Sequence, residues 1–457
     1  MKRKISYILI AILTLLILAS CDTEVKHEHK WNSGVITKEA TCTEEGVMKF
    51  TCPCGKTKTE PIPMKPHSLA DDRWTFDSAS FMYIQECSVC HSKQQKAPDS
   101  GVRVQGIKGF EDKLYKTPAE AYTEINQFLS EAENGGLVQN GLSEEKFKNI
   151  FTRIVQNGEK YDAEIVWTIY GEQEMIEDTG HNNYLLCGRK AAHYAENLHV
   201  SKFSVIGGND NAKLNCTNLV IPYEWWGGVC SDQLLSASFK DLAIDANGAK
   251  EEIKIGQAYN VGLSLAFDNC DITGKIYCYN NAKYTAEFNN CNFDSTNNGN
   301  YAIVAQGSES SEEKDGAIIN IQNCTFKNFR GINIQQKQAV ATIKGCTFDN
   351  CGNLSGEEKK NYYGILQLVC AKSILIEGNT IKNCIGNAIQ LHHEKQFTGT
   401  LTVKDNVIDN CTYAFSNYGQ QPFTLISSGN KISNSDIEHC CVKDGDEAKV
   451  VNVAKAL

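Results

Sequence analysis

The sequence predicts an all-β solenoid, in which similar coils of chain stack on one another, preceded by a cysteine-rich region and two helices. Three observations predict this fold. Residues 200–434 repeat with a period of roughly 27 residues. Apolar residues occupy fixed positions in every repeat, and polar residues alternate with them as in a strand with one buried face. Asparagine and cysteine recur at the turns between the strands.

Length, charge and composition restrict the number of domains and the class of partner. The chain has 457 residues, enough for two or three domains of about 150 residues. Its 45 Lys and Arg against 55 Asp and Glu give a net charge of −10. A protein that binds nucleic acid usually presents a basic face, so we expect no nucleic-acid partner. The 20 cysteines and 40 asparagines are the two unusual counts.

Residues 1–20 have the pattern of an export signal. Basic residues at 2–4 precede an apolar run at 5–18, which is short for a membrane span. The run ends in Leu18-Ala19-Ser20-Cys21, which resembles the lipobox of bacterial lipoproteins. The resemblance implies that Cys21 is lipidated and that the mature protein is exported and held at the membrane through this lipid, on the cell surface. An ordinary secretory signal followed by an incidental cysteine is the alternative.

Residues 21–97 contain a short cysteine-rich motif in two copies. The first copy carries His29-Lys30-Trp31, Cys42, Cys52-Pro53-Cys54-Gly55 and Ile62-Pro63. The second, degraded copy carries His67, Trp74 and Cys87-Ser88-Val89-Cys90-His91, with Phe76 about where Cys42 would be expected. The pattern resembles a cysteine-rich repeat that is common on bacterial surface proteins.

The cysteine turns of both copies predict a structural metal. Two thiolates in such a turn can converge on one tetrahedral ion, as in a zinc ribbon, and a region this small needs a staple. We expect the first copy to use Cys42, Cys52 and Cys54 with His29 or His67. We expect the second copy to use Cys87 and Cys90 with His67 or His91. Nineteen cysteines follow Cys21, an odd number that excludes a complete intrachain disulfide framework, but zinc, individual disulfides and free thiols all remain open.

Residues 103–164 change to a helical pattern. Thr117-Pro118-Ala119-Glu120 reads as a capping box with proline at the first helical position. A second helix is expected to begin at Ser143 and stop near Gly158, because apolar residues follow at helical spacing: Phe147, Ile150, Phe151 and Ile154. We expect both helices to cap the N-terminal end of the solenoid, where an open strand edge would otherwise be exposed.

The repeat itself is best seen from eight anchor positions in residues 165–440. The anchors are Leu242, Cys270, Cys291, Cys324, Cys346, Asn379, Asn406 and Asn430. Two residues after each anchor stands Ile or Phe, namely Ile244, Ile272, Phe293, Phe326, Phe348, Ile381, Ile408 and Ile432. The residues five before the anchors are all apolar, and those three before are apolar except Ser427. Such coils bury their inner face only by stacking on each other, so equivalent residues should form vertical columns.

Coils of this length with short strands and Asn or Cys at the turns resemble the right-handed parallel β-helix of the pectate-lyase-like superfamily. The resemblance covers about 165–440 and leaves 441–457 as a C-terminal tail. Stacking should place Cys270, Cys291, Cys324 and Cys346 in one buried column, where a thiol serves as a small apolar group. The asparagines should satisfy the turns and bond from coil to coil.

Candidate ligand residues lie on a second strand of the coils, at 331–335, 364–368 and 388–392. Alternation should turn these polar side chains outward: Asn333, Gln335, Gln367, Gln390 and His392. Trp225 and Trp226 could offer aromatic platforms, although a tryptophan pair more often packs. This polar, mostly uncharged row suits hydrogen bonds to a polysaccharide or host glycan, or adhesion. The alternative is a polysaccharide lyase or glycoside hydrolase with charged residues converging from several coils, such as Asp241, Asp268, Glu377, Glu394 or Arg330.

Overall fold

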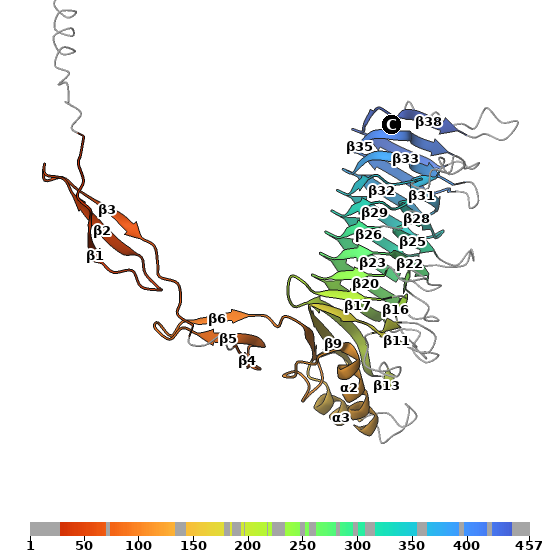
Figure 1. Ribbon diagram of the computed structural model, residues 1–457. Coiled ribbons are helices and arrows are strands. Elements are labelled where there is room, and N and C mark those ends of the chain that lie inside the picture. Colours follow the sequence, from red (N-terminus) through yellow and green to blue (C-terminus); the bar gives the residue numbers. More distant parts are fainter. Residues whose placement is uncertain are drawn as a thin grey trace, which may run out of the picture. The chain divides into compact units, whose positions relative to one another are not determined.

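The computed structural model divides the chain into two compact units, residues 1–76 with 83–96 and residues 77–82 with 97–457 (Figure 1). The residues that the structure describes are 28–69, 74–132, 143–177, 183–184, 193–195, 197–216, 218–221, 234–246, 252–255, 262–279, 284–295, 300–306, 316–353, 363–392, 397–417 and 423–440. The predicted signal sequence, Cys21 and the predicted tail lie outside them. No helix among the described residues is long and apolar enough to cross a membrane.

The cysteine-rich region folds into two small antiparallel sheets with the same layout. The first sheet is formed by β1 (Val35–Lys38), β2 (Gly46–Thr51) and β3 (Thr57–Ile62), and the second by β4 (Thr75–Asp77), β5 (Met82–Glu86) and β6 (Lys93–Lys96). A lysine amine lies over a tryptophan ring in each copy, Lys58 over Trp31 at 5.3 Å and Lys96 over Trp74 at 5.2 Å. The two copies of the sequence motif therefore share one structure.

Both predicted helices exist, and they lie beside the first strands of the second unit (Figure 1). Helix α2 spans Pro118–Ala132, and the Thr117 hydroxyl accepts a hydrogen bond from the Glu120 amide at 3.2 Å, as in a capping box. Helix α3 spans only Glu144–Ile150, from the N-cap Ser143. The expected stop near Gly158 was wrong, because residues 154–157 form a strand instead.

That strand belongs to the closing end of the solenoid. Strand β8 (Ile154–Asn157) and strand β7 (Gly101–Gln105) both pair antiparallel with β9 (Lys160–Tyr170), so each occupies part of the edge of β9. Helix side chains join the same buried core as these strands, among them Ile125, Leu129 and Phe147 beside Trp167. The helices and two short strands together cover the end of the stack, where the sequence predicted helices alone.

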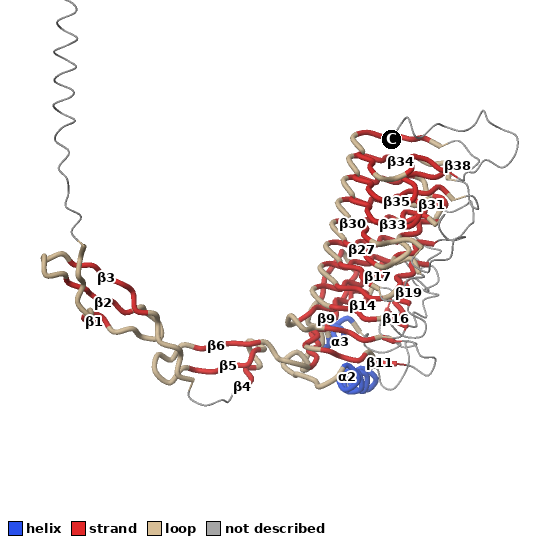
Figure 2. Tube along the Cα trace, turned by 45° about the horizontal axis from the view of Figure 1, so that its top comes forward, coloured by secondary structure: helices blue, strands red, loops and turns tan. Residues whose placement is uncertain are grey.

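From β9 onward the chain forms a parallel β-helix with two long sheets (Figure 2). A 13-stranded sheet takes one strand from each coil. It contains β7, β8, β9, β13 (His193–Ala195), β14 (Leu198–Gly207), β17 (Leu234–Lys240), β20 (Gly262–Asp268), β23 (Tyr284–Asn289), β26 (Ile318–Gln322), β29 (Val340–Lys344), β32 (Ser373–Glu377), β34 (Thr400–Lys404) and β36 (Thr424–Ser428).

A 19-stranded sheet takes the remaining strands, which are two per coil through most of the stack. It contains β10 (Glu172–Glu174), β11 (Ile176–Glu177), β12 (Asn183–Tyr184), β15 (Lys213–Asn215), β16 (Asn218–Ile221), β18 (Ala243–Asp245), β19 (Glu252–Ile255), β21 (Asp271–Thr273), β22 (Lys275–Tyr279), β24 (Asn292–Asp294), β25 (Ile303–Gln306), β27 (Thr325–Lys327), β28 (Ile332–Gln335), β30 (Thr347–Asp349), β31 (Gly364–Cys370), β33 (Thr380–Leu391), β35 (Val407–Asn417), β37 (Lys431–Ser433) and β38 (Asp436–Cys440).

The predicted columns are confirmed by the strand register. The residues two after the anchors pair in sequence from Ile244 to Ile432 along one file. Within it the rings of Phe293, Phe326 and Phe348 stack at centroid distances of 4.7 Å for each neighbouring pair. The anchor cysteines are buried, and the Cys324 sulfur lies 3.4 Å from the carbonyl oxygen of Phe288. The file also continues to Leu214 and Gln173, beyond the first predicted repeat.

The asparagine excess has a backbone cause. The turn position before each anchor has positive φ, and so does the position four after the anchor in the last five coils; Asn, Asp and Gly adopt this conformation most readily. The first position is occupied by Asp241, Asn269, Asn290, Asn323, Gly345, Gly378, Asp405 and Gly429, and the second by Asn328, Asn350, Asn383, Asn410 and Asn434. Amides also bond between coils, as in the 3.0 Å bond from Asn410 Nδ2 to Asn383 Oδ1.

Substitution of Asn410 tests this explanation. Asn410 has φ of 53° and carries the interstrand amide bond to Asn383. Asn410→Ala should lower the free energy of unfolding by about 1–2 kcal/mol, because alanine strains this backbone and loses the bond. Asn410→Gly loses the bond but relieves the strain, so it should cost less. Urea unfolding followed by circular dichroism measures both, and equal costs would contradict a backbone origin.

Candidate functional site: metal centres and a lateral face

The turn between β5 and β6 places two thiols close enough together for both to bind one ion. The Cys87 amide donates to the Ser92 carbonyl, and the His91 amide donates to the Cys87 carbonyl, both at 2.9 Å. His91 closes the turn at φ of 58°. The loop therefore folds back on itself and brings Cys87 and Cys90 to the same side, as in a zinc knuckle.

Backbone contacts from the first copy bring two more ligands to this turn. The Lys65 amide donates to the Thr41 carbonyl at 2.9 Å, which holds the chain leading to His67 beside Cys42. The Ser88 amide then donates to the Ser68 carbonyl at 2.8 Å. These bonds bring Cys42, from the loop between β1 and β2, together with His67 and the two cysteines of the second copy.

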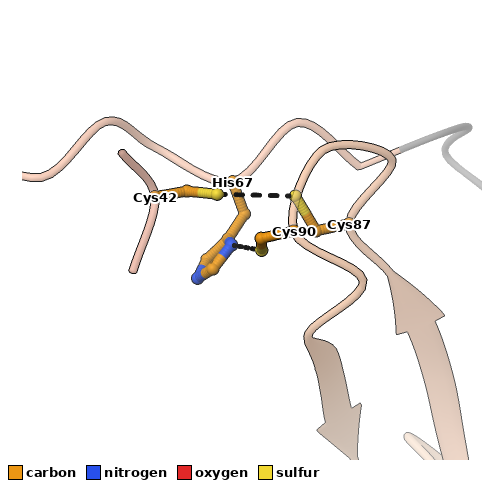
Figure 3. A group of neighbouring side chains, drawn as sticks. All are labelled: Cys42, His67, Cys87 and Cys90. Atoms are coloured by element: carbon orange, nitrogen blue, oxygen red, sulfur yellow. Dashed lines mark hydrogen bonds between the residues drawn. The ribbon is translucent and has the colours of Figure 1, made fainter. Parts of the chain in front are cut away.

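Cys42, His67, Cys87 and Cys90 form a four-ligand cluster (Figure 3), called the closed cluster below. Their ligand atoms all lie within 4.8 Å of one another. Cys42 Sγ is 3.9 Å from Cys87 Sγ, and Cys90 Sγ is 3.4 Å from His67 Nδ1. Zn–S and Zn–N bonds of about 2.3 and 2.1 Å in a tetrahedron put two sulfurs about 3.8 Å apart, and a sulfur and nitrogen about 3.6 Å apart. The cluster thus has the donor set and the spacing of a structural zinc site.

The surroundings of the closed cluster also favour a metal. Backbone amides of Cys90 and Val89 donate to the Cys87 sulfur and lower the pKa of that thiol to about 6. Hydrogen bonding with Cys90, together with burial, raises the pKa of Cys42 to about 11. The lowered pKa favours the thiolate form of Cys87, the form in which a cysteine would bind a metal. Ser92 Oγ lies 2.9 Å from Cys90 Sγ, and a hydrogen bond between them helps to orient this sulfur within the cluster.

A second group, His29, Cys52 and Cys54, is called the open cluster below. Its three ligand atoms also lie within 4.8 Å of one another, with Cys54 Sγ 3.4 Å from His29 Nδ1. The turn is one residue shorter than that of the second copy, and the Gly55 amide closes it by donating to the Cys52 carbonyl at 2.8 Å. Gly55 takes φ of 84°, so the shorter Cys-Pro-Cys spacing is accommodated by a glycine in the left-handed region.

The structure divides the predicted ligands differently from the sequence interpretation. Cys42 was assigned to the first copy with Cys52 and Cys54, but it lies with the ligands of the second copy. His67 also joins the second copy, which was one of its two alternatives. His91 belongs to neither cluster, because its Nδ1 points to Glu86 Oε1 at 2.9 Å. The assignment of Cys42 differs because the sequence interpretation kept the three cysteines of the first copy together.

The cysteine-rich unit has almost no apolar core of its own. Among its described residues, the buried apolar side chains are Ala40, Cys42, Cys52 and Cys87, three of which are cluster ligands. Larger apolar residues such as Val35 and Met64 are more than half exposed. No described cysteine is in a disulfide. Packing of apolar side chains among its described residues therefore offers the unit little stability.

The predicted ligand row of the β-helix lies in register but is mostly buried. Asn333, Gln367, Gln390 and Ser416 pair in sequence along the outer side of β28, β31, β33 and β35, and each is at most 8% exposed. The expected exposure was wrong for Asn333, Gln367 and Gln390. Gln335 and His392 are partly exposed. Asn333 Oδ1 and Ser416 Oγ are buried with no hydrogen-bond partner among the described residues.

Arg330 and two tyrosines lie at the beginning of this row. The Arg330 guanidinium is 3.2 Å from the ring centroid of Tyr363 and 5.0 Å from that of Tyr301. The Tyr301 hydroxyl donates to Gln367 Oε1 in the row. Burial raises the pKa of Tyr301 above its ordinary value, so this phenol stays neutral. Sequence reasoning missed both tyrosines, although Tyr301 lies just before β25 and Tyr363 directly before β31, two coils further along the stack. We call Tyr301, Arg330, Tyr363 and the row the lateral face.

Of the charged residues weighed for an enzyme, Arg330 lies at the lateral face, but the acidic ones that the structure describes, Asp241, Asp268 and Glu377, lie elsewhere. Glu377 pairs with Lys344 at 3.3 Å, and Asp268 lies 3.9 Å from Lys240, both on the 13-stranded sheet. Asp241 stands at a turn, where its carboxylate accepts from Asn269 at 2.7 Å. The remaining candidates, Glu394, Trp225 and Trp226, lie outside the described residues.

Comparison with known proteins agrees with the fold and adds no function. A family model described as "Right handed beta helix region" matches residues 274–454. No curated protein and no solved structure gives a significant match to the chain. The chain is thus a parallel β-helix protein whose N-terminal unit carries two Cys/His clusters that could hold a metal.

Proposed function

We propose that the protein is an exported lipoprotein in which a zinc-stapled spacer carries a β-helix that binds carbohydrate through its lateral face. The signal pattern ending in Cys21 supports export and lipid anchoring. The closed cluster and the nearly core-free unit around it support zinc as the staple. These parts together describe a surface protein with a metal-stabilised N-terminal unit and a separate binding domain.

The observation that carries the carbohydrate proposal is the combination of groups at the lateral face. Arg330 and Tyr363 are partly exposed and stacked, and they lead into a polar row in which Asn333 Oδ1 and Ser416 Oγ have no described partner. Planar amides, a guanidinium and an aromatic face are the groups that hydrogen-bond to sugar hydroxyls and pack on sugar rings. The positive charge of Arg330 favours glycans that carry a carboxylate.

Replacement of Arg330 tests this proposal. The full-length protein in detergent should bind a subset of immobilised glycans, acidic ones most strongly, and Arg330→Ala should weaken that binding at least about tenfold. The loss is expected because the charge and the stacked face disappear together. Dissociation constants from biolayer interferometry, with uronate-containing and neutral oligosaccharides, measure the effect.

A matched control lies on the other sheet. Lys344→Ala removes a cation that pairs with Glu377 on β29, and it should leave glycan binding unchanged. Equal losses in both variants would contradict a specific lateral face. Release of reducing ends or unsaturated products during the incubation would favour the lyase or hydrolase alternative over simple binding.

Lipid attachment can be tested separately. Cells producing the full-length protein should incorporate radiolabelled palmitate into it, and Cys21→Ala should abolish both the label and recovery in the membrane fraction. Cys42→Ala is the control, because it removes a cysteine that is a predicted metal ligand and not a lipid acceptor. Persistent labelling of Cys21→Ala would contradict the lipoprotein proposal.

A further inference from the structure

The two clusters take their ligands from equivalent positions of the two copies. In each copy a histidine precedes the first strand, His29 or His67, and a cysteine pair occupies the turn between the second and third strands. These three residues form the whole open cluster and three quarters of the closed one. The fourth ligand of the closed cluster, Cys42, comes from the preceding copy, from the loop between its first two strands.

The copies differ at the position of the donated cysteine. The loop between β1 and β2 contains Cys42, whereas the corresponding loop of the second copy, between β4 and β5, is Ser78-Ala79-Ser80-Phe81 and has no cysteine. No further copy follows the second one, so no later cluster needs a donated thiolate. The open cluster correspondingly contains three ligands among the described residues, and no donated cysteine joins them there.

We propose that the open cluster binds zinc through His29, Cys52 and Cys54 and leaves its fourth position to water, which an external imidazole or thiolate can replace. This inference rests on the proposed role of zinc. Three protein ligands with one open position are the arrangement of zinc sites that exchange ligands, whereas four protein ligands make a closed structural site. The open cluster would give the spacer a point at which a small nitrogen or sulfur ligand, or a partner's histidine or cysteine, can attach.

Exposure supports an accessible fourth position. In the open cluster Cys52 is buried, His29 is partly exposed and Cys54 is exposed, whereas the closed cluster has no exposed ligand: Cys42 and Cys87 are buried, and His67 and Cys90 are partly exposed. An incoming ligand can therefore approach the open cluster from solvent. The closed cluster has its tetrahedron filled by the chain, and displacing one of its ligands would require breaking the contacts that hold Cys42 beside His67.

Cobalt substitution of the full-length protein in detergent distinguishes the two clusters, because thiolate-bound Co²⁺ absorbs in the visible range. About two Co²⁺ ions should bind per chain, and imidazole should shift the spectrum of about half of them. Cys54→Ser should remove the imidazole-sensitive ion. Cys42→Ser should open the closed cluster and make about all bound cobalt sensitive to imidazole, which is the reciprocal change.

Other outcomes identify which proposal fails. Binding of no cobalt by either cluster would overturn the proposed zinc staple itself. Binding of two ions with no response to imidazole would leave the staple in place and overturn the open position. Cys21→Ser is included because a spectrum changed by that variant would show a fourth ligand within the chain. A metal-dependent dimer in sedimentation, again without an imidazole response, would show that a second chain fills the site.

Discussion

Removal of the metal is expected to unfold the cysteine-rich unit and leave the β-helix folded. Among its described residues the unit buries few apolar side chains, and three of the four buried ones belong to the two clusters. Structural zinc sites contribute about 10–16 kcal/mol of apparent binding free energy at neutral pH, far more than this small unit can gain from packing. Chelator treatment followed by hydrogen exchange should therefore expose the amides of residues 28–69 and 82–96 while those of the coils stay protected.

Matched variants separate loss of metal from loss of a surface histidine. His67→Ala removes a ligand of the closed cluster and should increase exchange at Cys87 and its neighbours even before the chelator is added. His91→Ala removes the neighbouring histidine, which faces Glu86, and should exchange like the unmodified protein. Protection that survives both the chelator and His67→Ala would show that the unit folds without metal.

The β-helix could be predicted in detail because parallel stacking repeats one register. Once Phe293, Phe326 and Phe348 were recognised as equivalent positions, the geometry of stacked strands required them to lie in one file. The asparagine-rich turns followed from the same periodicity. The extension of the file to Leu214 and Gln173 was missed because the coils at that end depart from the common spacing.

Features that depend on contacts between different elements were harder to predict. Helix α3 ends at Ile150 because the next residues pair with β9, and helical periodicity cannot report a competing strand partner. The ligand sets were divided wrongly because Cys42 reaches its cluster through backbone bonds between copies, such as that of Lys65 to Thr41. Spacing within one copy carries no information about such a contact.

The burial of the lateral face was also not predictable from the sequence pattern. Alternation along β28 and β31 indicated which side of the sheet Asn333 and Gln367 occupy, because side chains of a strand alternate between faces. It did not indicate that both are buried, since burial depends on the segments that cover the face. Tyr301 is one of the residues that cover the face, because its hydroxyl donates a hydrogen bond to Gln367 Oε1 two coils away.

The two units therefore rely on different sources of stability. The cysteine-rich unit concentrates its stabilisation in a few ligand atoms, so one substitution at a ligand should affect the whole unit. The β-helix distributes its stabilisation over columns that continue from coil to coil, and each coil is stabilised mainly by its neighbours. A substitution in a column should thus act locally but strongly.

Truncation of Phe326 is expected to have the largest effect in the β-helix. Its ring is 1% exposed and stacks between Phe293 and Phe348, at interplanar angles of 11° and 6°. Phe326→Ala should lower the free energy of unfolding by about 3–5 kcal/mol, because it removes a buried ring and leaves a cavity between two rings held in place by their strands. Denaturant unfolding monitored by circular dichroism measures the loss as a shift of the transition of the β-helix.

The controls for Phe326→Ala show whether the column or the strand is responsible. Phe326→Leu fills most of the space and should cost about 1 kcal/mol. Ile318→Ala shortens an apolar side chain on the neighbouring strand β26 that is 38% exposed, and should cost about 0.5 kcal/mol or less. A cost for Phe326→Ala no greater than that for Ile318→Ala would mean that neighbouring coils collapse into the space without loss. The stacked rings would then fill the interior without holding successive coils together.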